Sequence, residues 1–534
     1  MSGIISVIEK IDKHKKEMFM LTDKQKIDIY NEAVKIIKSH KGGIKIYGGY
    51  AQNMMIFKQI IIRYLFRVYK KFGVPYFIDS TNETTIVESV KKLLNTMDNK
   101  TKANYDFISY IKRNIKYINL SDCFYPVDID FKTDYAISEP HDIDLYSFKP
   151  LEIAEEIFYK CLEMGYKSAC IIEAIHHGTY SVRIRNPDGT TFNVCDLTYI
   201  PISYFNRIPY DEINGMLMVK DKWVFLDFYK MFSDPVCSSF RFEEVYNNRL
   251  KPFEKYFNFA YKPQPLIIEN TEIIKPVYDI LENFKFTDSI ISTGFKAYNN
   301  FLSYVGGNRS RNYFNYIKNY CYEFISVNYD EDNKTLQQLF NENNIEFSII
   351  KRQRFCYYKD YTTEYWINNN LVCIIYANNN ISIPYLLYRE KDNIYKYSCH
   401  TFTIYHFIMK MMFDICVLND KTKQNTYYII FSHLLEMKDL FLTRYKIGEF
   451  DDSPFQFITC ETIGKPILNF KTTFYKYSYF SLDESKITDK THKIISEWSY
   501  INISGNIIKA PKSATLSPEI KKESEPEIEK ESEL

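Results

Sequence analysis

Two aspartates on one short segment constrain this chain more than any other feature. His141–Tyr146 alternates polar and apolar residues, which is the pattern of a β-strand with one face toward a core. Residues two apart on a strand project to the same face, so Asp142 and Asp144 place two carboxylates side by side. Such carboxylates repel each other unless a cation lies between them, and Mg²⁺ or Mn²⁺ prefers oxygen ligands of this kind. The segment therefore predicts a metal-binding strand within a folded domain.

A hairpin further along the chain supplies a third carboxylate. Tyr180–Arg185 alternates polar and apolar residues, residues 186–189 have turn chemistry, and Thr190–Thr198 reads as the returning strand. Asp196, near the end of the returning strand, is well placed to complete the set of acidic ligands. Between the two strand motifs, Pro150 is expected to open a helix that runs from about residue 151 to 164.

A pair of glycines upstream predicts a site for phosphate. Residues 44–47 alternate like a short strand, Gly48-Gly49 turns the chain, and a helical run extends from about residue 51 to 72. Glycines before a helix let backbone N–H groups approach a triphosphate closely, and the helix dipole favours the anion. The candidates for nucleotide contact in this region are Gly48, Gly49, Tyr50 and Asn53.

Two alternatives stay open at the level of the residues. Asp128-Ile129-Asp130-Phe131 has the same alternation as the later pair of aspartates, but we prefer Asp142 and Asp144 because a helix and a hairpin follow them directly. Arg183 and Arg185 share one face of the hairpin strand, where they either contact phosphate or RNA or form an ordinary solvated face.

In this order the motifs resemble those of the DNA polymerase β-like nucleotidyltransferase superfamily. Tyr47-Gly48-Gly49-Tyr50, Asp142-Ile143-Asp144-Leu145 and Val194-Cys195-Asp196-Leu197 match its glycine turn, its acidic strand and its third carboxylate. Tyr50 stands where the family usually has Ser, and the gap from Gly49 to Asp142 is longer than usual. The whole chain is similar to the poly(A) polymerase catalytic subunits of large cytoplasmic DNA viruses, of the poxvirus and giant-virus type.

The resemblance implies a function and a set of partners. It implies template-independent addition of AMP from ATP to RNA 3′ ends, with two Mg²⁺ or Mn²⁺ ions held by Asp142 and Asp144. Asp196 would help to hold the ion that acidifies the primer hydroxyl. It further implies either a partner protein, as in the poxvirus type, or self-association, as in giant-virus counterparts, and of these we prefer a homodimer. The location it implies is the host cytoplasm or viral factory, with packaging in the virion. The alternatives are another terminal nucleotidyltransferase, for uridylyl or single-nucleotide transfer, and a non-catalytic RNA-binding subunit.

Composition narrows the class of protein. The chain has 534 residues and a formal net charge of +1, so nucleic acid would be attracted by local basic patches and not by a global field. Eleven cysteines without a C-x-x-C pair give no zinc ribbon, and the most apolar window, near residues 401–418, is interrupted by charged residues. We therefore expect neither secretion nor a membrane span. Segments 63–71, 309–318 and 351–359 interleave basic and aromatic residues, which suits either a single-strand groove or, more commonly, the outer face of a helix.

The expected fold class is α+β. It consists of a polymerase β-like nucleotidyltransferase domain, with a mixed sheet and helices, an N-terminal helical segment and a larger α/β C-terminal domain. No internal repeat is visible in the sequence. The expected divisions are residues 1–40, a helical segment with a helix from about residue 4 to 39; 41–205, the catalytic domain with an insertion at 78–135; 206–505, the RNA- or nucleotide-binding domain; and 506–534, a disordered acidic tail.

Overall fold

The computed structural model describes residues 9–11, 13, 20–72, 143–464 with short gaps, 472–476, 499–501 and 507–509. The short gaps fall at 175–177, 187–189, 214, 258–262, 269–272, 310, 354, 356–360, 379–381 and 460. The predicted insertion at 78–135, the rival pair Asp128 and Asp130, and Asp142 lie outside the described residues.

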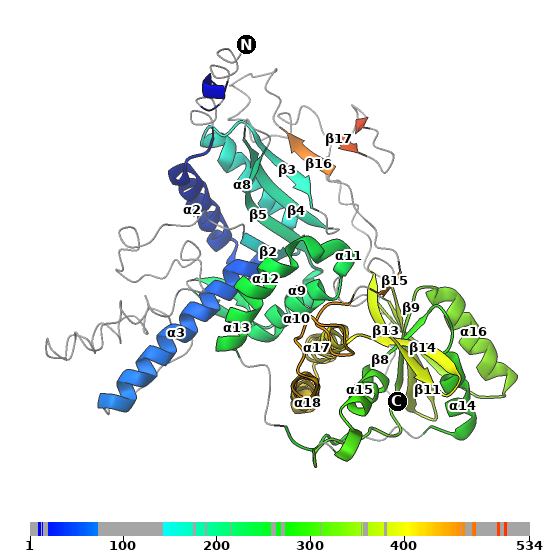
Figure 1. Ribbon diagram of the computed structural model, residues 1–534. Coiled ribbons are helices and arrows are strands. Elements are labelled where there is room, and N and C mark those ends of the chain that lie inside the picture. The colour runs from blue at the N-terminus through cyan, green and yellow to red at the C-terminus, as the bar shows by residue number, and fades with distance from the viewer. Residues whose placement is uncertain are drawn as a thin grey trace, which may run out of the picture.

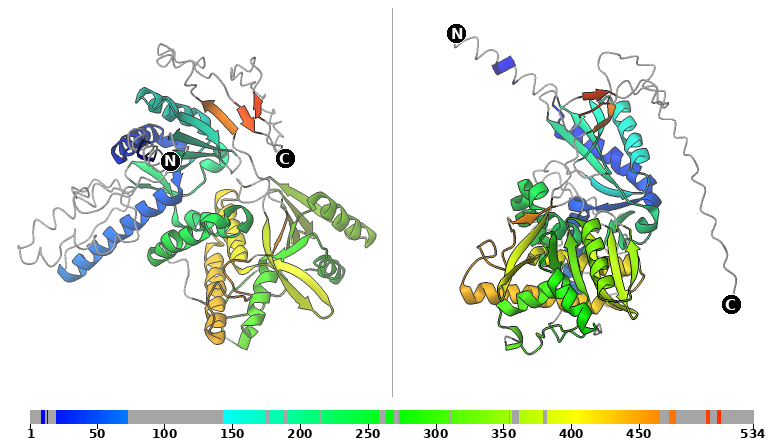
Figure 2. Two further views of the ribbon diagram at one scale, coloured as in Figure 1. Left: turned by 45° about the horizontal axis from the view of Figure 1, so that its top comes forward. Right: turned by 90° about the vertical axis from the view of Figure 1, so that its right-hand side faces the viewer.

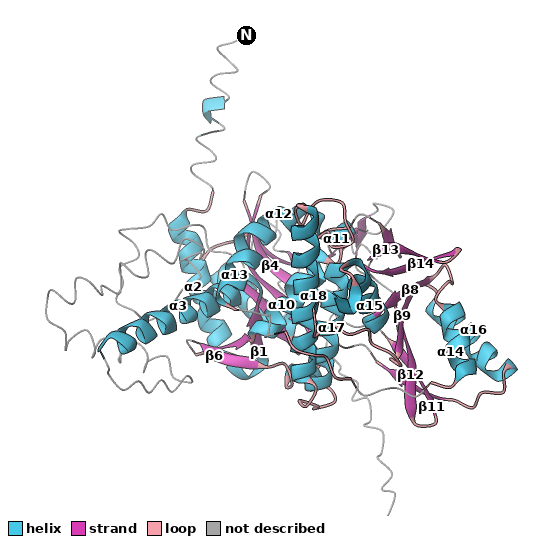
Figure 3. Ribbon diagram, turned by 60° about the horizontal axis from the view of Figure 1, so that its bottom comes forward, coloured by secondary structure: helices cyan, strands magenta, loops and turns pink. Residues whose placement is uncertain are grey.

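Two mixed β-sheets stand on either side of a layer of helices (Figures 1 and 3). The first sheet has the strand order β18-β17-β16-β3-β4-β5-β2-β1-β7-β6. Its strands are β1 Ile44–Tyr47, β2 Ile143–Ser147, β3 Ala169–Glu173, β4 Thr179–Arg185, β5 Thr191–Tyr199, β6 Tyr210–Ile213, β7 Met216–Val219, β16 Thr472–Lys476, β17 Ser499–Ile501 and β18 Ile507–Lys509.

The second sheet has the strand order β10-β11-β12-β9-β8-β14-β13-β15. Its strands are β8 Ile290–Thr293, β9 Tyr322–Ser326, β10 Ser348–Arg352, β11 Thr362–Ile367, β12 Asn370–Ala377, β13 Ile383–Glu390, β14 Asn393–Ser398 and β15 Thr462–Ile463. The α-helices of eight or more residues are α2 Asp23–Ser39, α3 Gly48–Phe72, α8 Pro150–Glu163, α10 Asp221–Phe232, α14 Lys275–Phe284, α15 Gly294–Tyr304, α16 Tyr329–Glu342, α17 His400–Cys416 and α18 Gln424–Tyr445. The shorter α-helices of the described residues are α9 Ile202–Phe205, α11 Pro235–Ser238, α12 Phe242–Val245 and α13 Lys251–Tyr256.

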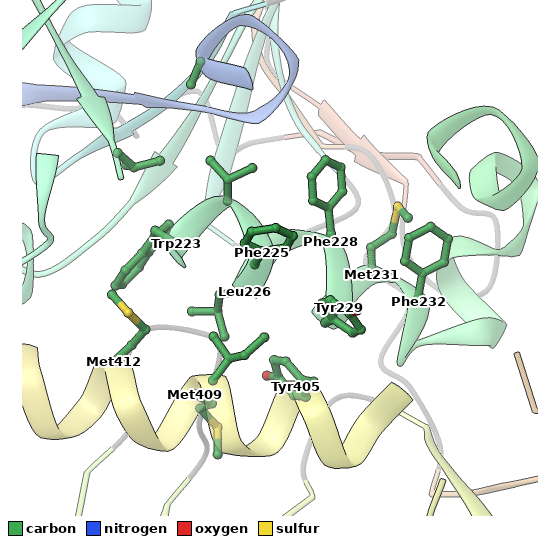
Figure 4. Packing of buried hydrophobic residues seen from close by; sticks show 14 of the residues in the cluster. Trp223, Phe225, Leu226, Phe228, Tyr229, Met231, Phe232, Tyr405, Met409 and Met412 are labelled. Carbon is green, nitrogen blue, oxygen red and sulfur yellow. The ribbon is translucent and has the colours of Figure 1, made fainter. Parts of the chain in front are cut away.

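The helical layer joins the two sheets through one continuous hydrophobic core. Helix α10 packs against α17, and Figure 4 shows Trp223, Leu226 and Tyr229 of α10 beside labelled side chains of α17. The Trp223 and Phe355 rings lie 5.9 Å apart, and the Phe232 and Phe457 rings 4.8 Å apart, so residues of the second half pack directly on α10. Apolar burial of this extent fixes α10 relative to both sheets.

The local sequence signals of the first half are confirmed. Strand β1 runs into helix α3, Pro150 stands at the start of α8, and β4 pairs antiparallel with β5. The helix predicted from about residue 4 to 39 is wrong as one unbroken helix, because residues 21 and 22 are not helical. Thr22 instead caps α2, accepting from the Gln25 backbone N–H while the Gln25 side chain accepts from the Thr22 N–H.

The second sheet repeats the connectivity of the first. Strand β1 is followed directly by Gly48, where φ is +66° and α3 begins, and β8 is followed directly by Gly294, where φ is +61° and α15 begins. Strand β2 pairs antiparallel with β1 and parallel with β5, as β9 pairs antiparallel with β8 and parallel with β12. The orders β3-β4-β5-β2-β1-β7-β6 and β10-β11-β12-β9-β8-β14-β13 correspond strand for strand. The expectation of no internal repeat is therefore wrong at the level of topology.

The end of the chain returns to the first sheet. Strand β16 pairs antiparallel with β3 at the sheet edge, and Figure 2 shows these orange and red C-terminal strands beside the cyan ones. Strand β18 lies inside residues 506–534, which were predicted as a disordered tail. Its two isoleucines pair with β17. Among the described residues, no helix combines the length and the apolar character needed to cross a membrane.

Candidate active site

The site is built where three strands place their residues in register. Asp144 of β2 is the Cα partner of Asp196 on the parallel strand β5, and it also faces Tyr47 on the antiparallel strand β1. Both aspartates are half-buried. The structure therefore brings together two of the three carboxylates predicted from the sequence, one from each of two neighbouring strands.

Gly48 makes the approach of these elements possible. A Cβ atom at this position would lie 2.6 Å from Cγ and 2.9 Å from Cβ of Asp144, and φ is +66°. Only glycine fits this combination of a left-handed backbone and a close neighbour. Because α3 begins at this residue, its first backbone N–H groups and the positive end of its dipole lie beside the carboxylate.

A short chain of hydrogen bonds orients Asp196. Ser181 Oγ donates to Asp196 Oδ1, and Asn193 Nδ2 donates to the same oxygen at 3.0 Å. Arg183 Nη2 donates to Ser181 Oγ at 3.2 Å. Arg183, which was predicted to contact phosphate or RNA, is therefore linked to the Asp196 carboxylate through Ser181. Arg185, at the exposed end of β4, lies on the same face further out. Donors to a carboxylate stabilise its charged form and fix its direction.

A cavity of about 150 Å³ opens in front of the two aspartates. Three of the predicted site residues line it, namely Gly48, Asp144 and Asp196. Its other walls come from β1, the residue after β3, β4, α3, α10 and the segment after α10: Tyr47, Gln52, Ala174, Thr179, Asp227, Phe228, Lys230, Met231, Asp234, Ser238, Arg241, Val245 and Arg249.

The remaining predicted nucleotide contacts are not among the cavity-lining residues. Tyr50 is fully buried in the hydrophobic core, where its ring lies 6.3 Å from that of Tyr30. Asn53 is half-buried on α3, and Gln52, one residue earlier, is the α3 side chain that lines the cavity. Gly49 lies beside the cavity wall, because a Cβ atom there would contact Arg249 Nη1 at 3.0 Å.

Three cations that sequence reasoning missed face the cavity. Lys230 comes from α10, Arg241 from a 3₁₀ turn at residues 239–241, and Arg249 from a π-helical turn at residues 246–250. Burial lowers the pKa of Lys230 to about 8, although the charges of Asp234 and Asp227 oppose the shift. Nothing in the local sequence singles these residues out, since each lies more than 30 residues beyond the last acidic motif.

Aromatic contacts hold α10 against the acidic strand. The Tyr47 and Tyr146 rings stack with their centroids 3.8 Å apart and an interplanar angle of 7°. Tyr146 OH donates to Asp227 Oδ1 at 3.2 Å, and Trp223 Nε1 donates to Tyr146 OH at 3.4 Å. The side of α10 that carries Asp227 and Lys230 is thereby fixed relative to β1 and β2.

The donor set fits a hard divalent cation. Within the part of the chain that the structure describes, no three His, Cys, Asp or Glu side chains form a cluster suited to a metal ion. The described site offers two register-paired carboxylates, and the predicted third ligand, Asp142, lies outside the described residues. Carboxylate oxygens that face each other across adjacent strands are the ligands that Mg²⁺ and Mn²⁺ take.

The corresponding position in the second half of the chain has a different chemistry. A Cβ atom on Gly294 would lie 2.8 Å from Cδ of Glu323, so Glu323 stands in the place of Asp144. The partner of Glu323 on β12 is Ile374, where the first half has Asp196. The second half therefore lacks the paired carboxylates of the first.

The Glu323 carboxylate is paired with cations of the chain itself. Its oxygens lie 2.7 Å from Lys410 Nζ and 2.9 Å from His406 Nε2, and Tyr376 OH donates to it at 2.8 Å. Burial alone would raise the pKa of Glu323, but the charges of Lys410 and His406 outweigh it and hold that pKa well below its usual range. The Lys410 ammonium group thus provides a countercharge for the carboxylate that stands in the place of Asp144.

Comparison with known proteins finds similarity to proteins of giant viruses. Residues 111–238 match the sequence model of the family described as "Poly(A) polymerase catalytic subunit", and this segment contains Asp144, Asp196 and Lys230. A protein of Acanthamoeba polyphaga mimivirus assigned as a poly(A) polymerase catalytic subunit is 22% identical over 386 residues. That alignment covers 66% of this chain and 63% of the relative, which is less than two thirds of the relative's length.

A solved structure has a similar fold. The crystal structure of the Megavirus polyadenylate synthase superposes with a TM-score of 0.59 at 17% identity, over 95% of this chain and 94% of that one. The mixed α/β architecture predicted from the sequence is confirmed by this likeness. The resemblance to giant-virus poly(A) polymerase subunits, stated from three short motifs, is confirmed as well.

Proposed function

We propose that this chain is a polynucleotide adenylyltransferase that adds AMP from ATP to RNA 3′ ends. The observation that carries the proposal is the register pair Asp144 and Asp196 beside the Gly48 turn, in a cavity that three cations also face. Carboxylates for a divalent cation and cations for a polyphosphate are the two halves of a phosphoryl-transfer site. The matched family and the shared fold support the same reading.

Each side chain has a role in this scheme. Asp144 and Asp196, with Asp142, would hold the Mg²⁺ or Mn²⁺ ions, which when bound lower the pKa of the primer hydroxyl and neutralise charge on the triphosphate. Lys230, Arg241 and Arg249 would bind the β- and γ-phosphates against the first backbone N–H groups of α3.

The remaining contribution is orientation. Ser181 and Asn193 fix Asp196, and the primer hydroxyl would attack the α-phosphate in line with the departing pyrophosphate. Catalysis of this kind consists mainly of positioning and charge neutralisation, and it forms no covalent intermediate with the chain.

The test is extension of a labelled oligo(A) primer with each of the four NTPs separately, in Mg²⁺ or Mn²⁺. We expect ladders made chiefly with ATP, which are lost in Asp144→Asn and in Asp196→Asn. Ladders made chiefly with UTP, or a single added nucleotide, would favour another terminal nucleotidyltransferase. No extension with any nucleotide, together with retained RNA binding, would favour a non-catalytic RNA-binding subunit.

Three further expectations belong to the proposal and rest on the resemblance. They are a homodimer, a location in the host cytoplasm or viral factory, and packaging in the virion. Light scattering coupled to gel filtration tests the first, and fractionation of infected cells and purified virions tests the others.

A further inference from the structure

One large aromatic ring stands in solvent beside the catalytic cavity. Phe240 is 77% exposed, whereas most phenylalanines of the described chain are buried. It lies in the 3₁₀ turn at residues 239–241, and two neighbours in the sequence, Ser238 before the turn and Arg241 at its end, both line the cavity. An apolar ring in water at the edge of a polar cavity is the kind of exposure that marks a binding site.

A guanidinium group accompanies the ring. Arg241 Cζ lies 5.8 Å from the Phe240 ring centroid, within the range of a cation–π contact. Arg241 Nε is buried and has no hydrogen-bond partner among the residues that the structure describes. An aromatic face next to an arginine is the combination with which proteins hold single-stranded nucleic acid, because the ring stacks on a base and the cation attracts the phosphates.

The turn that carries Phe240 is anchored on both sides. Asp234 Oδ1 accepts from the Cys237 backbone N–H at 3.3 Å, and the Phe232 and Phe242 rings pack 5.3 Å apart in the core. The exposed ring is therefore presented by a fixed element, which lowers the entropy lost when a ligand stacks on it.

We propose that Phe240 stacks on a base near the 3′ end of the RNA primer and so positions the terminal hydroxyl at the cavity. This rests on the proposed function. The triphosphate is expected inside the cavity, against the turn at Gly48 and Gly49, whereas Phe240 does not line the cavity and is exposed to solvent next to Arg241, which does. Stacking on a base tolerates any sequence, as addition to varied RNA 3′ ends requires.

The test measures binding of a fluorescein-labelled oligo(A) primer by anisotropy without ATP, so that no extension occurs. We expect Phe240→Ala to weaken binding about tenfold or more, and Phe240→Trp to bind as well as the wild type. Tyr445→Ala is the matched control, since Tyr445 is an aromatic residue 56% exposed at the end of α18. In steady-state extension, Phe240→Ala should raise KM for the primer and leave KM for ATP unchanged.

Two results would overturn the inference. One is equal primer binding by the wild type and Phe240→Ala, and the other is a rise in KM for ATP alone, which would place adenine on the ring instead. Failure of the wild type itself to bind or extend oligo(A) would count against the polymerase proposal. Extension by the wild type with an unaffected Phe240→Ala variant would count against this inference only.

Discussion

The Asp144 carboxylate lies directly over Gly48, so close that the turn has no room for any side chain. Gly48→Ala is therefore expected to lower primer extension by more than about 100-fold, with a loss of stability of about 1–2 kcal/mol from the left-handed backbone. Gly43→Ala is the matched control, because a Cβ atom there would meet only Phe148 Cζ at 3.9 Å. Rates from both variants, measured alongside thermal unfolding, check the expectation, and a fully active Gly48→Ala would contradict it.

Loss of either described carboxylate should remove activity without unfolding the chain. For Asp144→Asn and Asp196→Asn we expect kcat to fall by about 10³-fold, which corresponds to about 4 kcal/mol of transition-state stabilisation. The melting temperature should stay the same or rise, because a repulsive pair is removed. Titration with Mn²⁺ followed by electron paramagnetic resonance should show fewer bound ions.

The rival pair of aspartates gives the contrast for that experiment. Asp128→Asn/Asp130→Asn should extend primers and bind Mn²⁺ like the wild type. If this double variant alone lost both properties, the acidic strand would have been assigned to the wrong aspartates.

Titration of Lys230 should make kcat/KM for ATP decrease at alkaline pH. Its pKa is lowered to about 8, so its positive charge is lost as pH rises through 8, and kcat/KM for ATP should fall there. Lys230→Arg keeps its charge, so the ratio of its kcat/KM to that of the wild type should increase between pH 7 and 9. A ratio independent of pH would show that Lys230 does not contact the nucleotide in its charged form.

The Glu323 and Lys410 pair should matter for stability and not for chemistry. Lys410→Met leaves a buried carboxylate with His406 as its remaining basic partner, which is expected to cost about 3–5 kcal/mol in the free energy of unfolding. Glu323→Gln/Lys410→Met should recover part of that loss, because no unpaired charge remains. Urea unfolding checks both variants, and the folded fraction of each should still extend primers.

The same pair predicts a dependence of stability on acid pH. The pKa of folded Glu323 lies below its ordinary value of 4.5, so its contribution is complete above pH 4.5 and is lost as pH falls further. Glu323→Gln should therefore show a flatter stability curve below pH 4.5 than the wild type. Parallel curves would mean that other carboxylates control acid unfolding.

Local signals were enough to predict the elements that carry the site. The alternation in β1, β4 and β5, the glycine turn and Pro150 are each decided within a few residues, and each is confirmed. The pairing of Asp144 with Asp196 is a contact between strands 52 positions apart, which no local pattern fixes. It was suggested by the place of Asp196 near the end of the returning strand and by the resemblance.

What the sequence did not predict depends on distant contacts. Arg249 reaches Gly49 from 200 positions away, on a π-helical turn with no distinctive composition. The repeated topology was missed because its two halves have little sequence in common. They share a glycine after a strand and a carboxylate opposite that glycine, but Ile374 stands where the first half has Asp196. Tyr50 illustrates the opposite error, in which a residue was assigned to the site only because it is next to the glycines in sequence. Its side chain is buried in the core.

The cation that neutralises Glu323 is a side chain of the polypeptide itself. The two halves of the molecule should therefore differ in how their stability depends on dissolved ions. Because Lys410 belongs to the same chain, the charge of Glu323 in the second sheet is neutralised as soon as that sheet and α17 fold together. In the proposed enzyme, Asp144 and Asp196 depend on ions drawn from solution. Chelation of divalent ions should therefore lower the protection of backbone amides from hydrogen exchange in β2 and β5, and should leave that protection unchanged in β9 and α17. The local stability of the first half would then depend on the concentration of divalent ions, and that of the second half would not.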